Sequence, residues 1–139
     1  MFLPDVNLWL ALAFDGHVHH VPAATWYRGL SGPCFFCRVT QTGFLRLATN
    51  PKAFPDDAVS MSEAWDLYDA MLNDPKIAFV DEPPDLGPLW RGYTRRQSFS
   101  PKVWIDSYLA SFARAGGYEL VTFDKAFTSY SALNCSILG

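Results

Sequence analysis

Short apolar runs alternate along the chain with longer segments in which apolar residues recur every three or four positions. A short run bounded by Pro, Gly, Asn or Asp is typical of a buried strand, and the longer pattern is typical of an amphipathic helix. The first predicted strand begins at Phe2 and ends near Asp5. Four more are predicted at residues 34–39, 77–80, 119–123 and 135–138. Helices are predicted for residues 6–14, 62–73, 86–95 and 125–130. A further helix starts at Ser100 and Pro101 and ends at Ala115, and two more follow His20 and Thr40.

This alternation predicts the fold class. Strands that alternate with helices form a parallel sheet through right-handed crossovers, and the helices cover both of its faces. No linker divides the sequence and no internal repeat is visible. We therefore expect one α/β domain over residues 1–139.

Composition narrows the possible functions. Half of the 139 residues are hydrophobic, which is enough for a core, and the net charge is −3. Contact with nucleic acid therefore requires a local basic patch or metal ions at an acidic site. The three cysteines are an odd, sparse set typical of a reducing compartment. The first residues lack the basic start and the cleavage site of a signal peptide, and the apolar run over residues 6–14 is too short to cross a bilayer, so we expect a cytoplasmic protein.

Three carboxylates lie far apart in sequence but at equivalent places in this architecture. Asp5 ends the first predicted strand, Asp124 ends the fourth, and Asp106 lies in the second turn of the helix between them. If the first and fourth strands are neighbours, all three meet outside the carboxyl ends of the strands, where open α/β sheets bind ligands. Gathered there, they repel one another unless a hard cation such as Mg²⁺ lies between them. Taken singly, Asp5 and Asp124 can be helix caps and Asp106 can pair with Lys102 or an arginine.

The motifs around these aspartates resemble those of PIN-domain ribonucleases. The sequence reads Pro-Asp-Val-Asn at 4–7, Thr-Gln-Thr-Gly-Phe-Leu-Arg at 40–46, Trp-Ile-Asp-Ser-Tyr-Leu-Ala at 104–110 and Val-Thr-Phe-Asp at 121–124. Together these motifs look most like those of the VapC toxins of bacterial toxin–antitoxin pairs, and the likeness covers nearly the whole chain. It implies a Rossmann-like, three-layer fold with a parallel sheet ordered 3-2-1-4-5.

For function, the resemblance implies an endoribonuclease that depends on Mg²⁺ or Mn²⁺. Asp5, Asp106 and Asp124 would be the metal ligands. Asn7 would orient Asp5 or a bound water, and Thr122 would be a polar group next to the ligands that does not contact the metal. Water then attacks the phosphodiester in line and leaves a 5′-phosphate and a 3′-hydroxyl, so that no protein nucleophile is needed. The implied partners are RNA, a small cognate antitoxin whose tail covers the site, and a second copy of the toxin.

One position departs from the family pattern. The family usually has a glutamate where this chain has Gln41, which keeps an oxygen ligand but loses a negative charge. That loss weakens a second metal more than a first. Glu82 is a candidate replacement, but it ends a strand roughly 10 Å from the first at normal strand spacing, so we interpret it as a peripheral or turn residue.

Other chemically active residues are given less weight. Residues 90–96 combine cations with aromatic rings, a combination that suits contact with RNA. The same residues can equally form a solvated helix face or a surface that binds the antitoxin. The cations concerned are Arg91, Arg95 and Arg96. Arg46 is interpreted as pairing with an acid rather than touching RNA. The histidines, His17, His19 and His20, lack the spacing of a zinc site, and Cys34 and Cys37 are interpreted as core thiols on opposite faces of a strand.

Two other functions remain open from the sequence alone. A Mg²⁺-dependent phosphatase of the haloacid-dehalogenase type also has an aspartate after its first strand, but it needs a second aspartate where this chain has Asn7. The other alternative is a PIN fold that lost catalysis through Gln41 and only holds a partner.

Overall fold

The centre of the molecule is an all-parallel sheet whose strands follow the order β3-β2-β1-β4-β5. The computed structural model describes all 139 residues. The strands are β1 (Phe2–Pro4), β2 (Cys34–Phe36), β3 (Ile77–Phe79), β4 (Glu119–Thr122) and β5 (Cys135–Ile137). This order confirms the predicted one, and it makes β1 and β4 direct neighbours.

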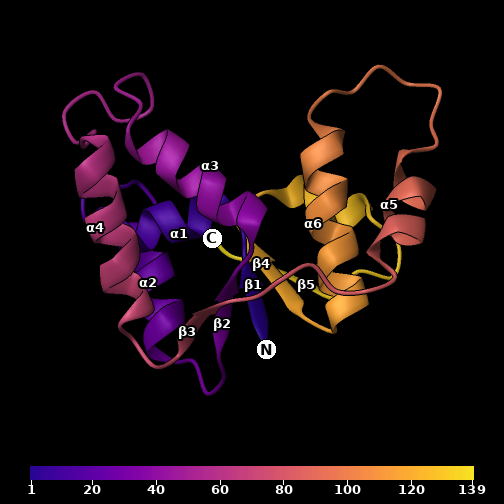
Figure 1. Ribbon diagram of the computed structural model, residues 1–139, viewed down its shortest axis with the longest axis horizontal. Helices are drawn as coiled ribbons and strands as arrows, with labels where there is room; N and C mark the ends of the chain where they lie inside the picture. Colours follow the sequence, from indigo (N-terminus) through magenta and orange to yellow (C-terminus); the bar gives the residue numbers. More distant parts are fainter.

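Helices lie on both sides of the sheet and complete a three-layer α/β fold (Figure 1). They are α1 (Val6–Ala13), α2 (His20–Arg28), α3 (Arg38–Ala48), α4 (Met61–Leu72), α5 (Leu86–Thr94), α6 (Val103–Gly116) and the short 3-10 helix η1 (Lys125–Ser129). One layer contains α1 to α4, and the other contains α5 and α6 (Figure 1). None of the helices combines the length and the apolar character that crossing a bilayer requires.

Alternating side chains of the strands build a separate core on each face of the sheet. Leu3 and Leu120 pack with Leu109 and Phe112 of α6 on one face. On the other face, buried side chains of β2, α1, α3 and α4 form the second core, which includes Cys34, Phe36, Trp9, Phe44 and Tyr68. Since successive residues of a strand point to opposite faces, three- and four-residue strands are long enough to hold both layers.

Several predicted boundaries change. The second strand ends at Phe36 instead of residue 39, because Cys37 already caps α3. Thr40 is not the cap. It lies three residues inside, where its hydroxyl accepts a hydrogen bond from the Cys37 N–H at 3.0 Å. The late helix begins at Val103, because Ser100 and Pro101 belong to the turn before it, so Asp106 lies in the first turn of α6 and not the second.

A close approach between α1 and α3 brings their starts together beside the end of β1. A Cβ atom at Gly43 would come within 2.7 Å of the Val6 side chain, so a larger residue would push α3 away from α1. The absence of a side chain at Gly43 therefore allows the polar face of α3 to lie next to Asp5.

Candidate functional site

A cleft of about 500 Å³ opens beyond the carboxyl ends of β1 and β4. Walls from α1, α3 and α6 enclose it. Its lining includes all three predicted aspartates together with Asn7, Arg38, Thr42, Gly43, Arg46, Lys102 and Ile105. Carboxylates from the start, the late helix and the last third of the chain therefore share one cavity, as the sheet order requires.

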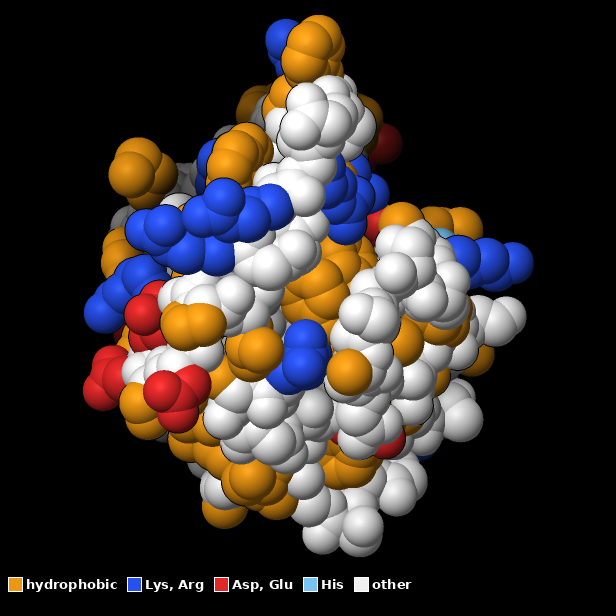
Figure 2. Space-filling view, turned by 90° about the vertical axis from the view of Figure 1, so that its right-hand side faces the viewer, with side chains coloured by type: hydrophobic (Ala, Val, Ile, Leu, Met, Phe, Trp, Pro, Cys, Tyr) orange, Lys and Arg blue, Asp and Glu red, His pale blue; other side chains and the backbone are white.

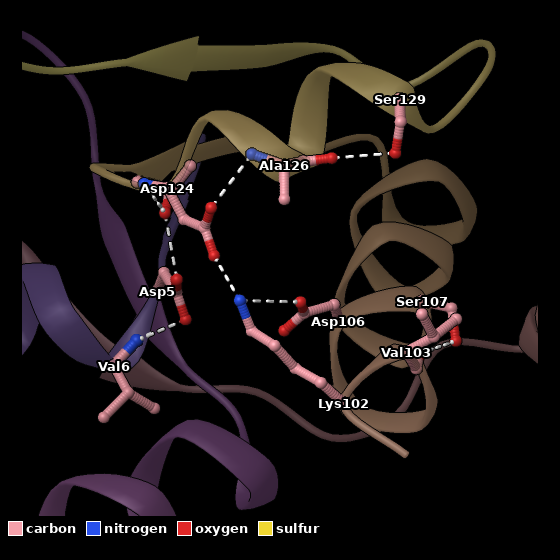
Figure 3. Close-up of polar contacts among 10 residues, drawn as sticks. Asp5, Val6, Lys102, Val103, Asp106, Ser107, Asp124, Ala126 and Ser129 are labelled. Carbon is pink, nitrogen blue, oxygen red and sulfur yellow. Dashed lines mark hydrogen bonds and ion pairs between the residues drawn. The ribbon is translucent and has the colours of Figure 1, made fainter. Parts of the chain in front are cut away.

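Asp5 is fixed by the two central strands. Its backbone N–H donates to the Val121 carbonyl at 2.9 Å, which ties it to β4. One carboxylate oxygen accepts the N–H of Val6 at 2.7 Å and so caps α1 (Figure 3). The other oxygen accepts the Thr122 hydroxyl at 2.9 Å. The Thr122 hydroxyl also accepts the backbone N–H of Asp124 at 3.0 Å, so Thr122 links two of the three aspartates.

The charge of Asp5 is poorly accommodated in this position. Burial raises the pKa of the Asp5 carboxyl, and the nearby charges of Asp106 and Asp124 raise this pKa further. The hydrogen bonds from Thr122 and Val6 act in the opposite direction but do not prevail. A nearby cation would therefore stabilise the ionised form of this buried carboxyl.

Lys102 brings a cation to the other two aspartates, and its ammonium lies between Asp124 and Asp106 (Figure 3). Its ammonium lies 2.7 Å from Asp124 Oδ2 and 3.6 Å from Asp106 Oδ2. The hydrogen bond from Lys102 is the main reason why the pKa of Asp124 is lowered, and the bond to Asp124 raises the pKa of Lys102. The pKa of Asp106 is raised by burial despite the attraction of Lys102.

The donor set fits a hard divalent cation in its chemistry. The three carboxylates and the amide of Asn7 offer the oxygen donors that Mg²⁺ and Mn²⁺ prefer. As the side chains now lie, however, no group of three or more acidic, histidine or cysteine side chains is arranged to hold a metal. The Lys102 ammonium takes up the carboxylate oxygens that such an ion would need.

Gln41 is held by a neighbour on its own helix. Its side-chain oxygen accepts a hydrogen bond from the Arg38 guanidinium at 2.6 Å, and Gln41 is not among the residues that line the cavity. This differs from the expectation that Gln41 keeps an oxygen near the metal. Glu82 lies outside the cleft as well, where its carboxylate accepts the Tyr108 hydroxyl at 2.7 Å.

Two arginines of α3, Arg38 and Arg46, line the cleft, although the sequence assigned neither of them to the site. Arg46 forms no ion pair, so the expectation that it pairs with an acid is wrong. Arg38, Thr42 and Arg46 follow one another at four-residue spacing, which places them on one face of a helix. That spacing was readable from the sequence and marks the polar face that α3 turns toward Asp5.

The cations of α5 lie elsewhere. Arg91 and Arg95 border a separate hollow with Trp90 and Trp104, outside the carboxylate cleft. Arg96 donates to the Tyr93 carbonyl at 2.8 Å and so helps to close the end of α5. Figure 2 shows Lys and Arg side chains gathered with apolar ones on this side of the molecule.

The histidines and cysteines take part in packing. His20 hydrogen-bonds the Ala11 carbonyl at 2.7 Å, and His19 stacks on Phe123 at a centroid distance of 4.4 Å. Cys34 and Cys37 are both buried, and they belong to the cores on opposite faces of the sheet.

A parallel sheet of this order, with aspartates converging at the carboxyl ends of its two central strands, defines the class of PIN-type domains. The family model described as "PIN domain" matches residues 2–133. The chain therefore belongs to the PIN-domain family, which agrees with the motifs of its sequence.

Within that family the chain is similar to VapC ribonucleases. It is 45% identical to "Ribonuclease VapC41" of Mycobacterium tuberculosis over 99% of both chains, and 34% identical to "Ribonuclease VapC38" of the same species over 89% of this chain and 85% of that one. Two crystal structures share the fold. M. tuberculosis VapC20, described as a sarcin–ricin loop cleaving toxin, superposes with a TM-score of 0.70 at 15% identity and covers 94% of this chain and 95% of its own. VapBC2 from Rickettsia felis, bound to a promoter DNA fragment, superposes with a TM-score of 0.72 at 12% identity and covers 99% and 98%. The predicted resemblance to VapC toxins is confirmed.

Proposed function

We propose that this protein is a VapC-type endoribonuclease toxin that cleaves RNA with the help of Mg²⁺ or Mn²⁺, and that residues 1–139 act as one PIN domain. The observation that supports this most strongly is the convergence of Asp5, Asp106 and Asp124 in one cleft. Relatives named as ribonucleases support the reaction class. The family match sets aside the phosphatase alternative.

The three aspartates would hold the cation. When bound, it supplies an activated water and neutralises charge on the phosphate that is attacked. Thr122 holds Asp5 in the orientation that faces the cleft, and its link to the Asp124 backbone keeps these two carboxylates in register. Asn7 lines the cleft within the first turn of α1 and is placed to orient Asp5 or a water.

Arg38 and Arg46 bind the RNA backbone in this proposal. Both line the cleft on the wall opposite Lys102 and Asp106, and neither is neutralised by an ion pair. Guanidinium groups bind phosphate through two parallel hydrogen bonds, which fixes the position of a phosphodiester as well as its charge. The side chains of α3 therefore place the scissile phosphate above the aspartates.

We further propose that a cognate antitoxin covers this cleft and that the toxin forms a homodimer. A structure of the VapBC2 complex, which has the same fold, supports partnership with an antitoxin. The hollow bordered by Arg91 and Arg95 is a candidate surface for such a partner, because it combines exposed cations with the rings of Trp90 and Trp104.

One experiment separates the enzyme from the binding-module alternative. Two observations favour that alternative, namely Gln41 at the usual glutamate position and Lys102 on the aspartates. The purified protein is incubated with RNA in Mg²⁺, in Mn²⁺ and in EDTA, and the product ends are analysed. The proposal predicts cleavage only with a divalent cation and products with 5′-phosphates, both lost in Asp5→Asn. RNA left intact under every condition, with the fold intact by circular dichroism, would support the binding module instead.

A further inference from the structure

Lys102 occupies an unusual position for a lysine. Two of the three ion pairs in the molecule are its own, and both join it to aspartates of the proposed metal site. It lies at the cap of α6, four residues before Asp106, and reaches across to Asp124 at the end of β4. Arg38 and Arg46 line the same cleft without touching a carboxylate, so contact with these acids is specific to Lys102.

The ammonium and a divalent cation cannot use the same oxygens. A Mg²⁺ or Mn²⁺ ion held by Asp106 and Asp124 needs their oxygens at about 2.1 Å. The Lys102 ammonium is within 2.7 Å of one of those oxygens and 3.6 Å of another. Two cations so close would repel each other in a partly buried cleft, so that one has to leave when the other binds.

Lys102 is able to leave. Its side chain is 69% exposed, whereas those of Asp106 and Asp124 are 15% and 26% exposed. It makes no side-chain cap for α6, and the residues just before it lie in an irregular segment and a turn instead of a helix or strand. A rotation of its flexible stem into solvent therefore breaks nothing but the two ion pairs, while the aspartates stay in place.

We propose that Lys102 is a built-in counter-cation, which holds the rim of the metal-free site together and competes with the divalent cation for Asp106 and Asp124. This inference rests on the proposed metal-dependent function. Lys102 is a positioning residue in this scheme. It sets how much metal the protein requires and contributes no chemistry to the cleavage.

The test is a titration with Mn²⁺ alone, followed by calorimetry, for wild type and Lys102→Met. Because the competing state is removed, Lys102→Met is expected to bind Mn²⁺ about tenfold more tightly. Arg46→Met is the matched control, since it removes a cation from the same cleft that touches no carboxylate, and its affinity should change by less than about threefold. Lys102→Gln should behave as Lys102→Met does.

A second readout follows the melting temperature, Tm, of the same variants in EDTA and in saturating Mn²⁺. Lys102→Met should melt below wild type in EDTA, because its carboxylates repel each other, and should gain more from Mn²⁺ than wild type does. Equal or weaker Mn²⁺ affinity in Lys102→Met, or an equal gain in Arg46→Met, would overturn the competition. The proposed metal-dependent function itself fails if wild type does not bind Mn²⁺, or if Asp124→Asn binds it as well as wild type does.

Discussion

The floor and the rim of the cleft hold their carboxylates in different ways. The floor is Asp5 with Thr122, at the ends of β1 and β4, and the rim is Lys102 with Asp106, at the start of α6. On the floor, the Asp5 carboxylate accepts hydrogen bonds from Val6 and Thr122, its backbone N–H is tied to Val121, and Thr122 is fully buried. On the rim, an exposed lysine lies 3.6 Å from Asp106 and 2.7 Å from Asp124. The fold therefore preforms one part of the site and leaves the other part adjustable.

Loss of the floor carboxylate should have the largest effect. Asp5→Asn keeps the cap of α1 but removes a charge that the metal needs, so RNA cleavage should fall by at least about 100-fold. Asp66→Asn, on the exposed face of α4, is the matched control and should cleave at the wild-type rate. Cleavage by Asp5→Asn within about tenfold of wild type would mean that the floor does not hold the catalytic ion.

The cations that bind RNA should belong to the cleft and not to α5. Arg46→Met is expected to lower kcat/KM for RNA about tenfold, because a charged hydrogen bond to phosphate is lost. Arg91→Met, which removes a cation from the separate hollow, should stay within about twofold. An equal loss in both variants, measured with the same RNA, would show that the substrate crosses α5 as well.

The Thr122 hydroxyl makes two of the hydrogen bonds that hold the floor of the cleft. Thr122→Val keeps the shape of the residue but removes the bonds to Asp5 and to the Asp124 backbone, so we expect a loss of about 1–2 kcal/mol in the free energy of unfolding. Cleavage should fall about fivefold through misplacement of Asp5. Thr122→Ser retains the hydroxyl and should recover most of both. Denaturant unfolding that is unchanged in Thr122→Val would remove the physical basis for a preformed floor.

The smallest expected effect is a pair of opposite shifts in Tm without metal. The pKa of Asp5 is raised, so the stability linked to it is present at acid pH and is lost as the pH rises through that value. Asp5→Asn should therefore melt a few degrees above wild type at pH 7 and equal to it at acid pH.

The pKa of Asp124 is lowered by Lys102, so its contribution is present at pH 7 and is lost as the pH falls through the lowered value. Asp124→Asn should melt below wild type at pH 7, and shifts of the same sign in both variants would contradict the contrast.

Sequence predicted the floor better than the rim. The position of Asp5 and Asp124 follows from strand ends and sheet order, which apolar runs and crossover rules specify. The contact between Lys102 and Asp124 joins residues 22 apart in sequence, and a local pattern carries no information about it. The α6 boundary was misjudged for a related reason, because a serine followed by proline suits a turn as well as a helix start.

Gln41 and Arg46 show the same limit at the level of side chains. Their helix and their spacing could be predicted, but which of them faces the cleft depends on partners such as Arg38, whose guanidinium holds Gln41. Orientation within a helix is fixed by the neighbours that tertiary packing supplies. Sequence therefore located the acids and underestimated the cations around them.

A crystal structure of the wild-type protein soaked in Mn²⁺, with anomalous scattering to locate the ion, tests the proposed metal site most directly. We expect a peak in the cleft, with oxygens of Asp5, Asp106 and Asp124 at about 2.1 Å and the Lys102 ammonium moved into solvent. Manganese that binds elsewhere, or a cleft that keeps Lys102 on Asp124 at saturating Mn²⁺, would contradict it.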